Sequence, residues 1–422
     1  MNTRAPRTSP SSMEVLALLF AVNVCSVMDR TIFSITAPLI AADLDLSDTQ
    51  IGALSGLLFS LFYATFGVPI ARMADRGDRG LVISLSLACW SAITMATGAA
   101  QSFIQLAIAR IGVAIGEAGA TPPSHAILAE RYALAARPFS MAIHSAGAPL
   151  GAGLGLALGG MLAATLGWRW TFVVLGAPGA LLALVVWWRL RERREPKPEH
   201  AADKGSISAD LAALFSVSSY RWLVAGFAVG AFIVNGMLQW LPTYFVRAFD
   251  ASTRDVGVGF GVAYGLGAFT GMLVGGRIGS KLVARDPRWA MWIASLSYVC
   301  TAPLGAAALL AGQIEIAYLC AFLMSAAATA AYGPAFAMVQ ELAPVRLRSL
   351  ASATALFFAT FIGAGFGPFV VGILSDHWDS GGADGLRTAL LCTLLLCPAP
   401  ALLYLRSARA LTPRPIAADA SP

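Results

Sequence analysis

Four ionisable side chains fall inside apolar stretches long enough to cross a membrane: Asp29, Arg30, Arg110 and Glu117. An ionised group that faces lipid costs several kcal/mol on any scale, so these side chains must face the interior of a helical bundle. Their charges sum to zero. A carboxylate beside a guanidinium can accept a proton, release its partner and favour another conformation. These residues therefore predict a proton-coupling site.

The spacing of these residues limits how they can pair. Arg110 and Glu117 are seven residues apart, which places them on one helix face about 10 Å from each other, too far for direct contact. Asp29 and Arg30 are neighbours that project about 100° apart. We expect pairing between the two stretches, with Glu117 as the first candidate for protonation and Asp29 as the second. The alternative is that buried ion pairs only fix helix packing, but the apolar stretches after residue 220 have no charge in their middles.

Polar and aromatic residues take the place of charges in the C-terminal half. We predict a substrate-binding wall that also includes Arg30 and Arg110 and is formed on the other side by Asn235, Gln239, Trp240, Tyr264 and Tyr332. Such a wall suits an amphipathic molecule, whose polar head would meet an arginine and whose apolar body would lie against the aromatic rings. Any one of these aromatic residues, taken alone, is better explained by packing between helices.

The composition requires that lipid surround most of the chain. Of 422 residues, 57% are hydrophobic and 12% are charged, and the mean hydropathy is +0.70, whereas soluble chains are about 25% charged. A soluble enzyme, a disordered regulator and a nucleic-acid-binding module are thereby excluded. Apolar runs of about 20 residues, the length of a membrane span, begin near Met13, Thr49, Gly80, Ser102, Pro138, Trp168, Tyr220, Arg254, Arg288, Gln313, Arg348 and Leu386. The sequence predicts an all-α membrane protein with twelve transmembrane helices.

The distribution of basic residues predicts the orientation. Of 29 Lys and Arg residues, 23 lie in the termini and in alternate loops on one side, and Arg169, Arg247, Arg254 and Arg387 lie on the other. Basic residues are retained in the cytoplasm, so both termini should be cytoplasmic. We expect a tail at 1–12, a six-helix bundle at 13–189, a linker at 190–219, a second bundle at 220–406 and a tail at 407–422. A short helix at 207–215 would lie within a solvated linker or on the membrane surface.

An internal repeat supports two related halves. Glu130 and Arg137 recur as Glu341 and Arg348 at an offset of 211 residues, and Pro123 recurs as Pro334 at the same offset. Three matches in one register indicate a duplicated bundle, and paired bundles favour alternating access to a central cavity.

Several motifs resemble those of the major facilitator superfamily. The first is Ala71-Arg72-Met73-Ala74-Asp75-Arg76-Gly77-Asp78-Arg79, which is similar to G-x-x-x-D-R-x-G-R except at Ala71 and Asp78. The second is Arg110 with Gly116-Glu117-Ala118, which is similar to R-x-x-x-G-x-G-x-A but has Ala114 in place of one glycine. The third is Gly167-Trp168-Arg169-Trp170-Thr171-Phe172, which is similar to G-W-R-x-x-F. The resemblance covers nearly the whole chain and implies two pseudo-symmetric six-helix bundles. It also implies that Asp75, Arg76, Glu130, Arg131 and Arg137 form a conformational latch, with solvated loop charges as the alternative.

Within this superfamily the chain is most similar to bacterial Spinster-like transporters. The residues that carry this likeness are Met28-Asp29-Arg30, Phe62-Tyr63-Ala64, Gly67-Val68-Pro69 and Gly116-Glu117-Ala118-Gly119. The anion:cation symporters share a similar Asp-Arg pair. The resemblance implies proton-linked transport of a small organic or lysolipid-like substrate, and the second family implies an organic-anion/proton symporter as the alternative. Gly147, Gly151, Gly155 and Gly159 recur every four residues, which allows close helix packing and resembles an antiporter motif.

The two histidines and the motifs that the sequence lacks bear on whether this membrane protein is an enzyme. His125 and His144 are expected in polar packing, with a proton relay as the alternative. The sequence lacks the spacings of a hydrolase, a nucleotide site or a metal site, so we predict no enzyme activity, no cofactor and no nucleic-acid partner. We expect a monomer in the cell membrane whose partners are the lipid bilayer, the substrate and protons.

Overall fold

The computed structural model describes residues 11–133, 136–190, 207–379 and 382–411, and the regular structure within these ranges is helical. The first half contains α1 (Ser12–Leu44), α2 (Asp48–Gly52), α3 (Leu58–Arg76), α4 (Arg79–Thr97), α5 (Phe103–Glu117), α6 (Thr121–Arg131) and α7 (Arg137–Leu190). The second contains α8 (Ile207–Ser216), α9 (Ser218–Phe249), α10 (Thr253–Val283), α11 (Trp289–Leu310), α12 (Ile314–Ala330), α13 (Tyr332–Glu341), α14 (Arg348–Phe358), α15 (Gly367–Asp379), α16 (Ala383–Leu394) and α17 (Pro398–Ala410).

Several crossings are built from more than one of these helices. The π-helical segment η1 (Ala53–Leu57) connects α2 to α3, and the π-helical segment η3 (Ala359–Phe366) connects α14 to α15. A 3₁₀ turn, η2 (Val345–Leu347), precedes α14. Serine side chains fix some of the helix starts, because Ser11, Ser102 and Ser252 accept hydrogen bonds from the first turns of α1, α5 and α10.

The predicted fold class, an all-helical membrane protein, is confirmed. Eleven described helical stretches are long and apolar enough to cross a membrane. The longest, α7, contains two crossings because its path bends at Gly167, where φ is 78° and the left-handed conformation favours glycine. Next to this bend, Trp168 and Arg169 both donate to Asp43 at the end of α1. The Gly-Trp-Arg motif therefore forms the turn between two crossings and attaches it to α1.

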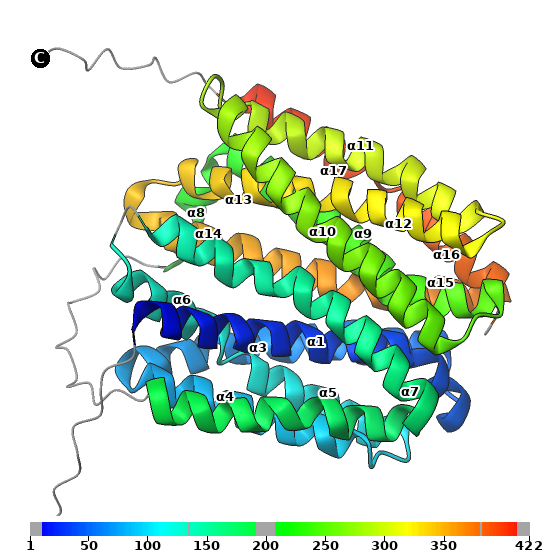
Figure 1. Cartoon of the computed structure of the whole chain (residues 1–422). Helices are drawn as coiled ribbons and strands as arrows, with labels where there is room; N and C mark the ends of the chain where they lie inside the picture. Colours follow the sequence, from blue (N-terminus) through cyan, green and yellow to red (C-terminus); the bar gives the residue numbers. More distant parts are fainter. Residues whose placement is uncertain (1–10, 134–135, 191–206, 380–381, 412–422) are drawn as a thin grey trace, which may run out of the picture.

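The helices gather into two groups, with α7 and α10 side by side between them (Figure 1). Glycines bring these two backbones together: a Cβ at Gly160 would lie 2.8 Å from the Cα of Gly257, and a Cβ at Gly261 would lie 2.8 Å from the carbonyl oxygen of Gly153. No sequence pattern described above predicts this contact between α7 and α10.

The glycine row that the sequence did indicate lies on another face of α7. A Cβ at Gly151 would meet the carbonyl oxygen of Val24 at 2.5 Å, and one at Gly155 would meet the carbonyl oxygen of Met28 at 2.7 Å. The predicted close approach is thus confirmed, and its partner is α1. Since α7 packs closely on both α1 and α10, it connects the Asp29–Arg30 segment to the opposite half.

The two π-helical segments also meet between the halves. A Cβ at Gly56 in η1 would lie 2.4 Å from the carbonyl oxygen of Gly365 in η3, and a Cβ at Gly52 would lie 2.5 Å from that of Pro368. Small residues therefore let the backbones of the α2–α3 and α14–α15 crossings touch on one side of the molecule.

The predicted linker helix contacts the second half of the molecule. The predicted helix exists as α8, but Leu214 is fully buried, and the ring of Phe215 packs edge-on against Tyr220 and Phe358 at 5.7 and 6.2 Å. Asp210 forms an ion pair with Arg346 at 2.8 Å. Part of its apolar side therefore packs on the second half of the molecule, and its place in a solvated linker or on the membrane surface stays a prediction.

The α7–α10 contact can be tested with an alanine substitution. In Gly257→Ala, the new Cβ would lie 2.6 Å from the carbonyl oxygen of Leu156, and such overpacking costs about 1–3 kcal/mol. We expect a lower thermal unfolding temperature in detergent. The matched control is Gly276→Ala on the same helix, where a Cβ meets nothing within 4 Å. Equal unfolding temperatures for the two variants would contradict the assignment.

Candidate functional site

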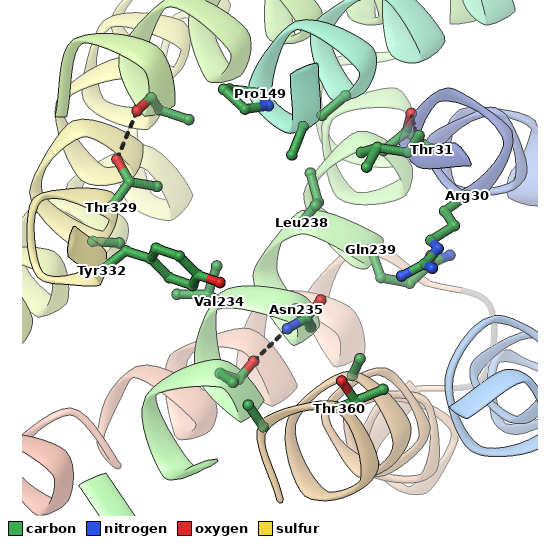
Figure 2. A pocket seen from close by; sticks show the side chains of 18 of the residues that line it. Arg30, Thr31, Pro149, Val234, Asn235, Leu238, Gln239, Thr329, Tyr332 and Thr360 are labelled. Atoms are coloured by element: carbon green, nitrogen blue, oxygen red, sulfur yellow. Dashed lines mark hydrogen bonds between the residues drawn. The ribbon is translucent and has the colours of Figure 1, made fainter. Parts of the chain in front are cut away.

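A cavity of about 500 Å³ lies between the two halves. Six of the predicted substrate-binding residues line it: Arg30, Arg110, Asn235, Gln239, Tyr264 and Tyr332. Figure 2 shows Arg30 on α1 and Gln239 on α9 beside each other, with the ring of Tyr332 on the opposite wall. The first half thus supplies the cationic wall, and the second supplies most of the aromatic residues.

Glu117 is the centre of the charged cluster. One carboxylate oxygen, Oε2, accepts hydrogen bonds from Ser26 Oγ at 2.9 Å and from Arg30 Nε at 2.8 Å, and it lies 2.7 Å from Arg30 Nη2. The other oxygen, Oε1, is buried and has no hydrogen-bond partner among the residues that the structure describes. The predicted pairing between the first and fourth spans is therefore present. Buried polar atoms are normally hydrogen-bonded, so the two oxygens of this carboxylate have unlike surroundings.

Arg30 connects this buried carboxylate to the cavity. Its side chain is 34% exposed whereas that of Glu117 is 0% exposed, and its guanidinium carbon lies 4.7 and 5.0 Å from the ring centroids of Phe59 and Tyr63. These rings hold the guanidinium by cation–π contact. Arg30 can therefore bind Glu117 with one side of its guanidinium while the exposed part of the same side chain is accessible from the cavity.

Asp29 and Arg110 are both buried, but they do not pair with each other. The carboxylate of Asp29 accepts a hydrogen bond from Thr94 on α4 at 3.2 Å. Arg110 donates from Nε to the carbonyl oxygen of Leu54 at 3.3 Å, and its guanidinium carbon lies 4.8 and 5.0 Å from the rings of Phe33 and Phe59. Within the described ranges no carboxylate forms an ion pair with Arg110. A buried cation without an ionic partner is suited to binding an anion.

The prediction that Trp240 belongs to the substrate-binding wall must be corrected, because Trp240 is not among the residues that line the cavity. It is fully buried, and its Nε1 donates to the carbonyl oxygen of Pro368 at 2.8 Å. The indole therefore packs α9 against α15. Trp240 and Gln239 are neighbours in sequence, so their side chains leave α9 in different directions, and the interior of a bundle cannot be told from the cavity wall by composition.

A second charged cluster closes the halves against each other at the end of the molecule away from α6, α8, α13 and α14 (Figure 1). Asp48 accepts two hydrogen bonds from Arg247, each at 2.7 Å, and one from Ser375 at 2.7 Å. The carboxylate of Asp376 accepts the backbone N–H groups of Asp48 and Thr49. This is a closed gate between the first turn of α2 and the ends of α9 and α15.

The predicted latch residues lie at the other end. Glu130 forms an ion pair with Arg79 at 2.8 Å, and the Nε of Arg137 donates to the carbonyl oxygen of Tyr132 at 3.0 Å. The side chain of Asp75 lies outside the described residues. The repeated pair Glu341 and Arg348 forms a 3.5 Å ion pair, whereas Glu130 uses Arg79, so the duplicated sequence does not produce the same pairing in both halves.

Other predicted residues of the latch are also engaged. Arg76 and Arg131 each take part in polar or electrostatic contacts. Both lie at the ends of helices in the first half, Arg76 at the end of α3 and Arg131 at the end of α6. The conformational role of this group remains a prediction.

Two groups of site residues were missed by the sequence reasoning. Ser26 and Thr94 each place a hydroxyl on a buried carboxylate, but serine and threonine are common in apolar helices and give no distinctive pattern. Asp48 and Arg247 are 199 residues apart in the sequence, and they meet only because the two halves close against each other. The one available signal was charge at the ends of predicted spans.

Two six-helix halves around a central cavity, with buried charges on its wall, define a membrane transporter rather than an enzyme. The family model described as Major Facilitator Superfamily matches residues 19–368. The chain therefore belongs to the major facilitator superfamily.

Comparison with individual proteins agrees with this family. An MFS-type efflux pump of Mycolicibacterium smegmatis is 38% identical over 92% of this chain and 89% of that protein. A probable L-galactonate transporter of Escherichia coli is 26% identical over 96% of this chain and 90% of its own length. The crystal structure of a bacterial homologue of the human lysosomal transporter Spinster, inward-facing and unoccupied, has a TM-score of 0.85 and 27% identity, covering 96% of this chain and 98% of that one. The likeness to bacterial Spinster proteins is confirmed.

The closed gate gives a double-mutant prediction. Arg247→Gln leaves the buried carboxylate of Asp48 without its main partner, which should cost about 3 kcal/mol. Adding Asp48→Asn removes the unpaired charge and should restore part of the lost stability, as measured by thermal unfolding in detergent. The control is Arg387→Gln, which breaks the exposed pair with Asp384 and should cost less than about 1 kcal/mol. Purely additive losses at Arg247 and Asp48 would exclude a coupled gate.

Proposed function

We propose that the chain is a secondary active transporter that couples protons to the movement of a small amphipathic or lysolipid-like molecule with an anionic head. Protonation occurs at Glu117, with Asp29 as the second site, and the substrate is bound by Arg30, Arg110, Asn235, Gln239, Tyr264 and Tyr332. The organic-anion/proton symporter is the alternative, and it uses the same cationic wall.

The single observation that carries the proposal is the asymmetric bonding of Glu117. In the described part of the chain, Oε2 has three donor groups around it, whereas Oε1 is buried and has no donor. A proton on this carboxylate removes the charge that holds Arg30. The guanidinium is then available to an anion in the cavity, so that protonation and substrate binding favour each other. This linkage gives the proton gradient a way to drive transport.

The nature of the wall supports an anionic amphipathic substrate. Within the described part of the chain, arginine and histidine line the cavity but aspartate and glutamate do not. On the opposite wall, Tyr332 stacks on Phe336 at 6.0 Å and lies 5.6 Å from Phe227, which suits an apolar body. The name of the L-galactonate transporter from Escherichia coli, a relative, is consistent with an acidic head.

The closed gate and the duplicated bundles support alternating access as the mechanism. The gate holds the halves together at one end, as in an inward-facing transporter, and the match to an inward-facing structure supports this assignment. We place both termini in the cytoplasm and the protein in the cell membrane as a monomer. The latch residues Asp75, Arg76, Glu130, Arg131 and Arg137 would stabilise the opposite conformation.

Replacing Glu117 tests proton coupling. Glu117→Gln keeps an oxygen acceptor for Ser26 and Arg30, but its side-chain amide neither gains nor loses a proton at physiological pH. We expect proton-driven flux into liposomes to fall to the level of empty liposomes, while the unfolding temperature is retained. The flux assay screens lysophosphatidylcholine, decanoate and tetraphenylphosphonium under an imposed proton gradient.

The control for this substitution is Glu315→Gln, an exposed residue in the first turn of α12, which should transport normally. Full pH-dependent flux by Glu117→Gln would exclude Glu117 as the coupling group. Preference for the hydrophobic cation over decanoate would exclude an anionic substrate.

A further inference from the structure

Two histidines form a separate cluster on the cavity wall. His125 on α6 and His144 on α7 have ring centroids 5.1 Å apart and ring planes 73° apart. Both residues line the cavity, and His144 is only 3% exposed. The mechanism built on Glu117 does not use either of them.

Both imidazoles lack hydrogen-bond partners within the described ranges. The backbone of His144 is held in place, because Asn23 on α1 donates to its carbonyl oxygen at 2.7 Å, but the ring itself is not held. Thr121 and Ser145 line the cavity with them. Ring nitrogens that no protein group holds, on residues that line the cavity, are free to hydrogen-bond a molecule inside it.

The position of the pair sets its distance from the arginine site. Asn23 and Arg30 both line the cavity and are seven residues apart on α1, which is two helical turns or about 10 Å. Since Asn23 donates to the backbone carbonyl oxygen of His144, the backbone of His144 lies beside α1 about two turns from Arg30. The wall therefore has two levels that favour an anion, and no aspartate or glutamate from the described residues lines the space between them.

We propose that His125 and His144 form a second anion subsite, which binds a second carboxylate or phosphate group of the substrate. The substrate class is then an elongated organic dianion with an apolar middle: one acidic group meets Arg30 and Arg110, and the other meets the imidazole pair. This inference rests on the proposed function, because it concerns the same cavity. Edge-to-face packing of two imidazoles for stability alone would not require that both residues line the cavity.

The experiment compares two probes that differ only in the second acidic group: decanoate and decanedioate. Binding to the full chain in lipid nanodiscs is measured by calorimetric titration and corrected against empty nanodiscs. A charge-assisted hydrogen bond to the second carboxylate should make decanedioate bind about tenfold more tightly than decanoate. In His125→Phe and in His144→Phe this preference should fall to about twofold or less, with decanoate affinity unchanged.

The control is His377→Phe, which replaces an exposed histidine at the end of α15, outside the cavity, and should keep the preference. If His144→Phe does not fold, as judged by thermal unfolding, then His125→Phe and His144→Leu, which also lacks a donor, take its place. Equal binding of the two probes by the native chain, or a preference that survives both histidine substitutions, overturns the subsite alone. Decanoate binding that is absent, or that is unchanged in Arg110→Gln, overturns the anionic head site of the proposed function.

Discussion

The ion pair between Arg30 and Glu117 is the interaction on which the rest of the molecule depends. A carboxylate in the interior of a membrane bundle is tolerated only with donors around it, so α1 and α5 must lie close enough for Arg30 and Ser26 to reach one oxygen of Glu117. Glycines on α7 allow α1 to pack closely on that helix, and the aromatic residues Phe59 and Tyr63 hold the guanidinium at the edge of the cavity. The pair thereby connects a carboxylate that is closed to solvent, the proposed proton site, with a guanidinium on the cavity wall, the proposed ligand site.

Much of the fold was accessible from the sequence because lipid imposes a simple rule. Apolar length predicts each crossing, and the bend at Gly167 explains how one continuous helix contains two of them. The motif around Glu117 predicted a partner in the first span, since a buried charge requires one. The position of α8 was not accessible, because its apolar side fits a membrane surface as well as it fits Phe358 and Tyr220.

The candidate site was predicted in part, and the errors have a common cause. The pairing of Arg30 with Glu117 could be predicted because few environments in a membrane accept a charge. Trp240 was misplaced because an aromatic residue suits both a cavity wall and a packed core, and only the direction of its side chain decides. The gate between Asp48 and Arg247 depends on how two halves close, which no local pattern encodes.

The π-helical segments η1 and η3 give the protein a mechanical property of its own. Wide turns replace the usual i→i+4 hydrogen bonds by longer ones and mark places where a helix bends easily. These two segments touch each other at the contact between the halves. Residues of both segments also line the cavity, so the places where these two crossings bend most easily lie beside it.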